Sequence, residues 1–298
     1  MAEKLKYFVN GQFRESKTDK WYDLHNPSTG EITGQAPCCT NDEVLEAIAA
    51  AKAAYPGWSA TPAIKRAQIL YRVRELILER MDELTMSVAK ENGKVWAESE
   101  GDVLKAKEGT ELATQVPSLM MGESIMDASR GYDTVKYREP LGVFAGIVPV
   151  NFPAMIPFGW MAPTCIAAGN TLVLKAASLT PKTAMLFAQL YKDAGVPDGV
   201  INVVTCSRNE INTILEHPDV KGITPVGLKI YEKAAANGKR CQALCQAKNH
   251  ALVMEDCALE RTVAGVINSA FGCAGQRCMA LSCCVVQDSI ADAFVAEL

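Results

Sequence analysis

The sequence lacks the signals that mark several common classes of protein. It has no run of lysine or arginine, and its 30 basic against 34 acidic residues give a formal net charge of −4. A nucleic-acid partner is therefore not expected, since such binders carry clustered positive charge. The N-terminus also lacks the apolar core and the small-residue cleavage site of a secretory signal, which indicates a cytoplasmic protein.

Metal-binding and disulfide patterns are missing as well. The eleven cysteines include no Cys-x-x-Cys pair, and none of the three histidines stands at zinc-finger spacing from them. An odd number of cysteines, without the framework of a small secreted protein, indicates reduced thiols. We therefore expect no metal site and no disulfide. A Gly-x-Gly-x-x-Gly fingerprint for dinucleotide binding is also absent.

One long segment without charge, from Pro140 to Leu174, could in principle cross a membrane. Five prolines interrupt it, and the amides of Asn151 and Asn170 would need polar partners in lipid. A buried strand, a loop, a helix and a second strand explain the segment better. We therefore expect no membrane partner.

The first part of the chain combines short β-like pieces, from Tyr7 to Phe13, with explicit helix signals. Thr40 and Glu43 can form a capping box at the start of one helix. Thr61-Pro62 predicts the start of a second helix, which we expect to continue to Asn92-Gly93. The pattern then predicts a helix over Glu98 to Thr114 and an exposed ribbon over Met120 to Arg138.

From residue 142 onward, apolar runs alternate with helical segments. Continuous apolar runs are typical of strands that are covered on both faces, and short alternation of strand and helix predicts a doubly wound parallel sheet of the α/β class. The expected strands are Gly142 to Val150, Asn170 to Leu174, Val200 to Cys206 and Val220 to Thr224; the helices start at Thr180-Pro181, at Ser207 with Glu210 as its capping box, and near Val226.

A second α/β unit begins after Arg240. Its expected elements are two strands, Cys241 to Leu244 and Ala251 to Met254, a helix from Leu259 to Phe271, and a last helix from Ile290 to Leu298. The chain stops there without a cap or a covering strand, which predicts a missing C-terminal portion.

Three side chains are candidates for chemistry. Cys278 follows a helix among small residues and next to Arg277, where a thiolate could act as a nucleophile, although a buried structural cysteine or a protease pair with His217 or His250 are the alternatives. Asn151, after the first apolar strand, could donate to an oxyanion or only to its own loop. Lys175, at the end of the next strand, could reach a ribose or phosphate or could simply be solvated.

Taken together, several segments resemble the aldehyde dehydrogenase superfamily over essentially the whole chain. These segments are Pro149 to Pro153, Gly169 to Lys175 and Phe271 to Cys278; within the superfamily, Leu119 to Gly122, Ala247 to His250 and Gly275 to Ser282 resemble the methylmalonate-semialdehyde dehydrogenase branch, which makes acyl-CoA products. The resemblance implies a dinucleotide-binding domain formed by residues 1–121 and 141–246, a bridging ribbon over 122–140, and an incomplete catalytic domain over 247–298. It also implies a homo-oligomer.

The resemblance assigns roles to the candidate residues. Cys278 would attack the aldehyde carbon, and the Asn151 amide with the Cys278 backbone N–H would hold the oxyanion. NAD would accept the hydride, with Lys175 at the adenosine ribose and further cofactor contacts at Val150 and Phe152. Ser178 stands where many relatives have a glutamate that binds the ribose, so NADP is also possible.

Two further positions bear on the acceptor and the substrate. Leu244 stands where hydrolytic relatives carry a glutamate base, and because a leucine cannot take a proton from water, coenzyme A is the expected acyl acceptor. Arg277 matches one of the two arginines that hold the substrate carboxylate in this branch, and Lys105 stands at the other. Because the branch also loses the substrate carboxylate as carbon dioxide after the oxidation, the product expected from methylmalonate semialdehyde is propionyl-CoA.

Two departures from the family pattern keep other readings open. The Gly-Ser turn beside the pyrophosphate is missing before Pro225-Val226-Gly227, and Gln246 replaces a glycine near the nicotinamide. The leading expectation is CoA-acylating oxidation of a malonate-type semialdehyde. The alternatives are a hydrolytic aldehyde dehydrogenase and an inactive fragment with a structural or binding role.

Overall fold

The computed structural model describes residues 3–224, 227–245 and 247–298. The strands are β1 (Tyr7–Val9), β2 (Gln12–Arg14), β3 (Trp21–His25), β4 (Ile32–Pro37), β5 (Ser124–Ser129), β6 (Tyr132–Val135), β7 (Val143–Ile147), β8 (Thr171–Lys175), β9 (Ile201–Val204), β10 (Val220–Thr224), β11 (Arg240–Cys241), β12 (Asn249–Val253) and β13 (Leu281–Val286).

The α-helices are α1 (Asn41–Ala60), α2 (Ala63–Glu79), α3 (Met81–Asn92), α4 (Trp96–Ala113), α5 (Val116–Leu119), α6 (Ala162–Ala167), α7 (Lys182–Asp193), α8 (Arg208–Glu216), α9 (Leu228–Ala236), α10 (Leu259–Phe271) and α11 (Ala291–Glu297). A π-helical segment, η1 (Ile156–Met161), precedes α6, and two 3₁₀ turns, η2 (Gly272–Gly275) and η3 (Asp288–Ile290), flank β13.

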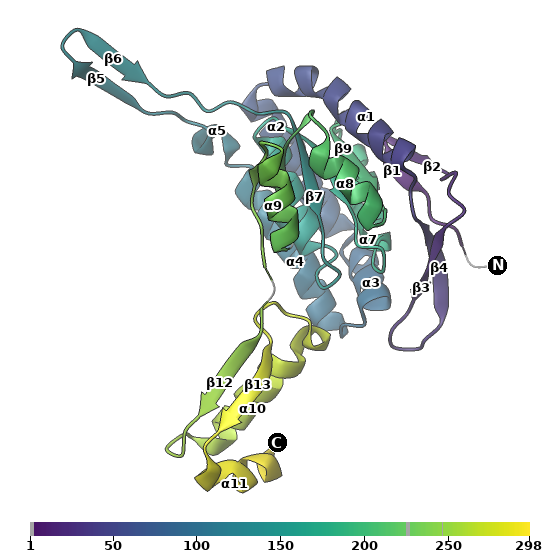
Figure 1. The fold of residues 1–298 in the computed structure, drawn as a ribbon, viewed down its shortest axis with the longest axis vertical. Helices are drawn as coiled ribbons and strands as arrows, with labels where there is room; N and C mark the ends of the chain where they lie inside the picture. The colour runs from purple at the N-terminus through teal and green to yellow at the C-terminus, as the bar shows by residue number, and fades with distance from the viewer. Residues whose placement is uncertain (1–2, 225–226, 246) are drawn as a thin grey trace.

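A seven-stranded sheet forms the centre of the molecule, in the order β11-β10-β7-β8-β9-β1-β2 (Figure 1). The five strands from β11 to β9 are parallel, and β1 and β2 extend the sheet as antiparallel strands. The chain proceeds from β7 to β8 and β9 on one side, then returns to place β10 and β11 on the other. This confirms the doubly wound α/β fold and puts its switch point between β7 and β10.

Each face of this sheet is covered by helices, which is why β7, β8 and β9 bury nearly all of their residues. On one face α1, α8 and α9 bury residues such as Val173 and Ile223 in a common cluster. On the other face η1, α6 and α7 cover Leu172 and Leu174, with α2 and α4 packed into the same cluster. The two clusters hold rigidly the strand ends that carry the candidate residues.

The predicted helix caps are confirmed where the capping residues lie within one turn of each other. Thr40 and Glu43 form the capping box of α1, and Ser207 and Glu210 form that of α8. Gly93 ends α3 in the left-handed conformation at φ 79°, as a glycine past a helix end permits.

The prediction of one helix from Thr61-Pro62 to Asn92-Gly93 is wrong. Thr61 ends α1, Pro62 is the N-cap of the next helix, and Arg80 separates α2 from α3 with φ −111° and ψ 22°. Both helices pack against α4 and α7, and α2 packs in addition against α5 and α6. These tertiary contacts favour a break that the helical periodicity does not reveal.

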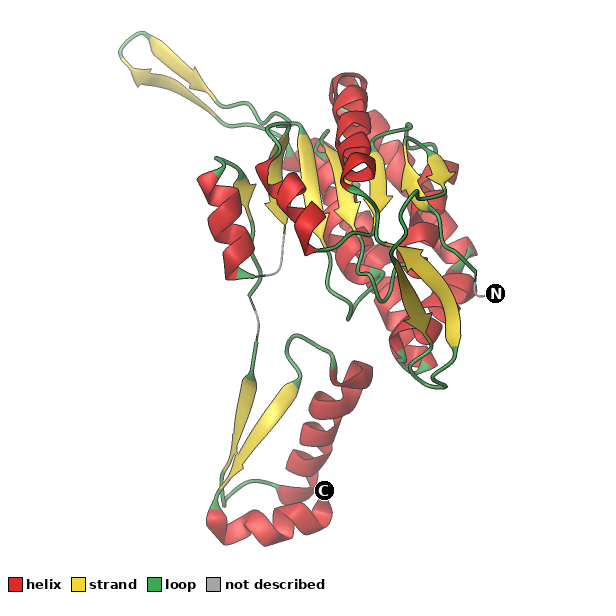
Figure 2. Ribbon diagram, turned by 45° about the vertical axis from the view of Figure 1, so that its right-hand side comes forward, coloured by secondary structure: helices red, strands yellow, loops and turns green. Residues whose placement is uncertain are grey.

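Two parts of the chain extend away from the sheet (Figure 2). The predicted ribbon is an antiparallel hairpin of β5 and β6 in which every strand residue is exposed. Residues 247–298 form a smaller unit in which β12 and β13 pair in parallel and α10 links them.

The strands β3, β4 and β13 were not predicted, because their residues carry no clear alternation. The domain boundaries remain predictions.

No helix in the described part of the chain is both long and apolar enough to span a membrane. All eleven cysteines are free thiols.

Candidate active site

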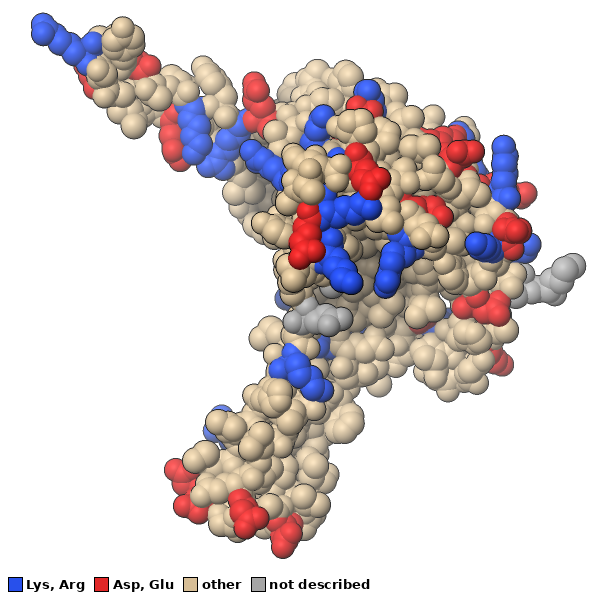
Figure 3. All heavy atoms as spheres, viewed as in Figure 1, with Lys and Arg blue, Asp and Glu red and all other residues tan. Residues whose placement is uncertain are grey.

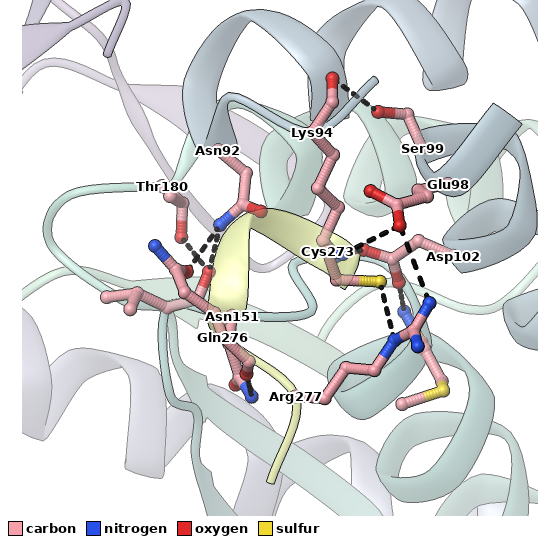
Figure 4. A network of polar contacts seen from close by, with 12 residues as sticks. Asn92, Lys94, Glu98, Ser99, Asp102, Asn151, Thr180, Cys273, Gln276 and Arg277 are labelled. Atoms are coloured by element: carbon pink, nitrogen blue, oxygen red, sulfur yellow. Dashed lines mark hydrogen bonds and ion pairs between the residues drawn. The ribbon is translucent and has the colours of Figure 1, made fainter. Parts of the chain in front are cut away.

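The candidate site lies where the loop after β7 meets the loop after α10. The second loop starts with the 3₁₀ turn η2, in which Cys273 and Ala274 have positive φ angles of 54° and 56°. Such left-handed backbone is unusual for residues with a side chain and sharply redirects the chain. The redirected loop brings Gln276 against Asn151 (Figure 4).

Asn151 and the cysteine loop are joined directly. The Asn151 side-chain nitrogen donates to the backbone carbonyl of Gln276 at 2.7 Å, two residues before Cys278. An amide nitrogen carries two hydrogens, so one remains for another acceptor. Cys278 is exposed, and within the described residues its backbone N–H has no acceptor. A tetrahedral oxyanion formed at this thiol would require N–H donors of this kind.

The chain beyond Cys278 is held by Asn249, at the start of β12. Its side-chain nitrogen donates to the backbone carbonyls of Cys278 and Ala280, each at 3.0 Å. These two bonds restrain the backbone that carries the thiol. Asn249 belongs to the segment from Ala247 to His250 that resembles the methylmalonate-semialdehyde dehydrogenase branch. Its contact with the backbone of Cys278 was not predicted.

Arg277 points back toward α4. Its Nε donates to the Cys273 sulfur at 3.3 Å, and another guanidinium nitrogen lies 3.4 Å from a Glu98 carboxylate oxygen. That same oxygen accepts the backbone N–H of Cys273 at 2.7 Å. Lys105 also lies on α4, but it is exposed and pairs with Glu108 at 2.6 Å. No contact joins Lys105 to Arg277 among the described residues.

A buried ion pair anchors the loop that carries Asn151. Lys94 lies 2.9 Å from Asp102, with both side chains inaccessible to solvent, and the Lys94 ammonium sits 3.9 Å above the ring of Phe152. The other oxygen of Asp102 accepts the backbone N–H of Met155 at 2.7 Å. Burial raises the pKa of Asp102 above its ordinary value, and Lys94 opposes that shift. The ion pair thus contacts this loop at two places, the ring of Phe152 and the backbone of Met155.

Lys175 ends β8 beside the switch point of the sheet. Burial lowers the pKa of its ammonium below the ordinary value, with the thiols of Cys206 and Cys38 nearby. Within the described residues no carboxylate pairs with it. A partly buried cation without a counter-charge, at the carboxyl edge of a parallel sheet, suits a ribose or phosphate group. Ser178 follows in the same loop and is half-buried.

A pocket of about 480 Å³ lies beside β7 and β10. Thr224, Gln242 and Leu244 line it from one side, and Trp160 and Met161 line it from the other. Asn151 and Cys278 are not part of its lining, so this pocket is distinct from the loop contact that joins them. Pro225, Val226 and Gln246, which depart from the family pattern, lie outside the described residues.

Asn92 and Glu98 were not predicted to be residues of the site. Asn92 appeared only as a helix end, yet it donates to the backbone carbonyl of Val150 and to the side chain of Gln276. Glu98 appeared only as a helix start. Both act on residues more than 170 positions away along the chain, as the separations of 184 and 175 show, so no local signal could have found them.

Comparison with known proteins identifies the family. A model of the aldehyde dehydrogenase family matches residues 13–298. This chain belongs to the aldehyde dehydrogenase family. Malonate-semialdehyde dehydrogenase 2 of Geobacillus kaustophilus is 45% identical over 302 aligned residues, which cover all of this aldehyde dehydrogenase chain and 62% of the relative.

Solved structures agree with this assignment. Methylmalonate-semialdehyde dehydrogenase from Oceanimonas doudoroffii superposes on this aldehyde dehydrogenase with a TM-score of 0.93 at 39% identity, over all of this chain and 62% of the other. A Sinorhizobium meliloti protein assigned as the same enzyme, solved in complex with NAD, gives a TM-score of 0.94 at 34% identity and the same coverage. The chain thus spans about three fifths of the length of the relatives it matches.

Proposed function

We propose that this chain carries out the CoA-acylating oxidation of malonate semialdehyde or methylmalonate semialdehyde, with NAD as hydride acceptor. The contact between Asn151 and the loop of Cys278 carries the proposal, because it joins an amide donor to the loop that bears an exposed thiol. The names of the relatives support the substrate class, since they include malonate-semialdehyde dehydrogenases and an acylating human enzyme that is 44% identical over 95% of this chain.

The residues of this chain account for the formation of an acyl-enzyme. The Cys278 thiolate adds to the aldehyde carbon, and the resulting oxyanion accepts hydrogen bonds from the free hydrogen of the Asn151 amide and from the Cys278 backbone N–H. Collapse of this thiohemiacetal expels a hydride and leaves a thioester on Cys278. Bound NAD supplies the hydride acceptor for this step.

Lys175 is the residue best suited to hold the cofactor. Its partly buried ammonium, which has no acidic partner among the described residues, would bind a ribose hydroxyl of the adenosine half. The backbone at Val150 and the fixed ring of Phe152 would bound the nicotinamide end. Ser178 adds no negative charge at the ribose, so we include NADP as a second cofactor.

Release of the acyl group is assigned to coenzyme A. Leu244 occupies the position of the hydrolytic base and carries no group that can accept a proton. The thiolate of coenzyme A would attack the thioester carbonyl, and the Cys278 thiolate would leave. Arg277 would hold the substrate carboxylate with the guanidinium hydrogens that Cys273 and Glu98 do not use, and Lys105 would add positive charge from α4.

We further propose a homo-oligomer in the cytoplasm. The exposed β5–β6 hairpin, with apolar side chains on both strands, supports self-association. Eleven unpaired thiols suit a reducing compartment.

The test is the initial rate of NADH formation from malonate semialdehyde, with and without coenzyme A. We expect turnover that requires coenzyme A, disappears in Cys278→Ala and persists in Cys245→Ala, which removes the other exposed thiol. Turnover without coenzyme A would instead establish the hydrolytic reaction. No turnover, with no saturable heat in a calorimetric NAD titration, would leave a fragment with a binding role.

A further inference from the structure

Asn92 is the last residue of α3 and connects three parts of the candidate site. Its side chain is only 5% exposed. The side-chain nitrogen donates to the backbone carbonyl of Val150 at 3.0 Å and to the side-chain oxygen of Gln276 at 3.2 Å (Figure 4). One buried amide therefore reaches the loop after β7 and the loop after α10 at once.

The two residues that Asn92 contacts lie within two positions of Asn151 and Cys278. Val150 precedes Asn151, and Gln276 lies two positions before Cys278. The direct bond from Asn151 to the Gln276 carbonyl is a single link about which the loops can still pivot. The Asn92 contacts supply a second link through the Gln276 side chain, and two links fix an orientation that one cannot.

Among the described residues, the side chain of Asn92 leaves one buried polar atom unpaired, and this unfavourable feature argues against a role in packing alone. The side-chain oxygen of Asn92 is buried, and in the described part of the structure it has no hydrogen-bond partner. A buried polar atom without a partner is unfavourable, so an apolar residue would suit the position better if packing were its only task. The two donated bonds are what an apolar residue could not provide.

We propose that Asn92 is a positioning residue that sets the orientation of the Asn151 amide relative to Cys278. It does not touch the aldehyde and acts through Val150 and Gln276. This inference rests on the proposed acyl-transfer function, and it extends that function to a residue on α3, far from both loops in sequence.

Thr180 provides a matched control. Its hydroxyl donates to the same Val150 carbonyl at 3.4 Å, and it is buried, but it makes no contact with the Gln276 loop. Thr180→Val thus removes one bond to Val150 without breaking the second link. Gln276→Ala does the converse, because this exposed side chain can be removed without disturbing the core.

The kinetic test compares Asn92→Asp, which keeps the shape but cannot donate, with Gln276→Ala and the double variant. We expect kcat to fall about tenfold in each single variant, because a small misplacement of reacting groups slows the reaction strongly, with the KM for NAD within about twofold. The double variant should lose no more kcat than either single variant does. The kcat of Thr180→Val should equal that of the unmodified chain. Additive losses, or an equal loss in Thr180→Val, would overturn the proposal.

Hydrogen exchange, followed by mass spectrometry, tests the same idea without activity. Amides in residues 272–280 should exchange about tenfold faster in Asn92→Asp and Gln276→Ala, whereas those of α7 should not change. If these amides accelerate but the unmodified chain has no turnover, the positioning role holds and the proposed function fails. Unchanged exchange in residues 272–280 would reject the positioning role whatever the activity.

Discussion

Arg277 makes contacts within the protein and still has hydrogens to offer a ligand. Of the five guanidinium N–H groups, one meets the Cys273 sulfur and another faces Glu98. The contacts with Glu98 and Cys273 restrain the guanidinium without neutralising it fully, since its side chain is about one third exposed. Such a restrained planar cation suits recognition of a carboxylate.

The substitution Arg277→Lys should therefore separate substrates by charge. Loss of the planar, two-point contact should raise the KM for malonate semialdehyde about tenfold, equivalent to about 1.4 kcal/mol, and should leave the KM for uncharged propanal nearly unchanged. Steady-state kinetics on both aldehydes measures the difference. Lys105→Ala is the companion variant, and it tests whether the second cation contributes. An equal effect of Arg277→Lys on both aldehydes would show that the arginine only supports the loop.

At the scale of the element, the buried pair of Lys94 and Asp102 joins α4 to the loop that follows β7. Removing the cation in Lys94→Met leaves the Asp102 carboxylate buried without a counter-charge, so we expect a loss of about 3–5 kcal/mol in the free energy of unfolding. Urea denaturation measures it. Lys105→Ala breaks the exposed pair with Glu108 on the same helix and should cost less than about 1 kcal/mol. Equal losses in the two variants would contradict this account.

Glu91 connects α3 to the start of α7 and makes stability depend on pH. It is buried and accepts the backbone N–H groups of Lys182 and Thr183. Burial raises its pKa from 4.5 to about 7, so the folded state holds the proton more tightly than the unfolded state does. The stabilisation is complete below pH 4.5 and is lost as the pH rises through 7.

Glu91→Gln removes this titration. Relative to the variant, the unmodified chain should lose about 3 kcal/mol in the free energy of unfolding between pH 4 and pH 8. Urea denaturation of both proteins at several pH values provides the comparison. A difference that does not vary with pH would mean that Glu91 has the same pKa in both states.

The elements also show what could be predicted from the sequence. The caps at Thr40 and Ser207 depend on neighbours within one turn, and they were predicted correctly. The break at Arg80 depends on the other helices that pack against α2 and α3, and it was not predicted. In the site, Asn151 and Cys278 remain predictions that depend on the family resemblance, because spacing alone left their roles ambiguous. Asn92 was missed because its function exists only after distant loops come together.

At the scale of the whole molecule, apolar residues are exposed on both projecting parts. On the hairpin, Ile125, Met126 and Tyr132 are 60–73% exposed; on the unit formed by residues 247–298, Leu252 and Phe271 are 73% and 72% exposed. Figure 3 shows basic side chains at the end of this unit nearer the sheet, acidic ones at its far end, and mostly uncharged surface between them. Apolar surface of this kind favours association with another protein surface.

The hairpin is the better candidate for association between copies of this chain. A two-stranded hairpin with no buried residue is marginally stable alone, and both of its edges offer unpaired backbone groups to another strand. We expect sedimentation velocity to show association that weakens in the double variant Ile125→Ser, Tyr132→Ser and persists in Leu252→Ser, its equally exposed counterpart. If Leu252→Ser disperses the assembly and the hairpin variant does not, the contact between copies lies on the smaller unit instead.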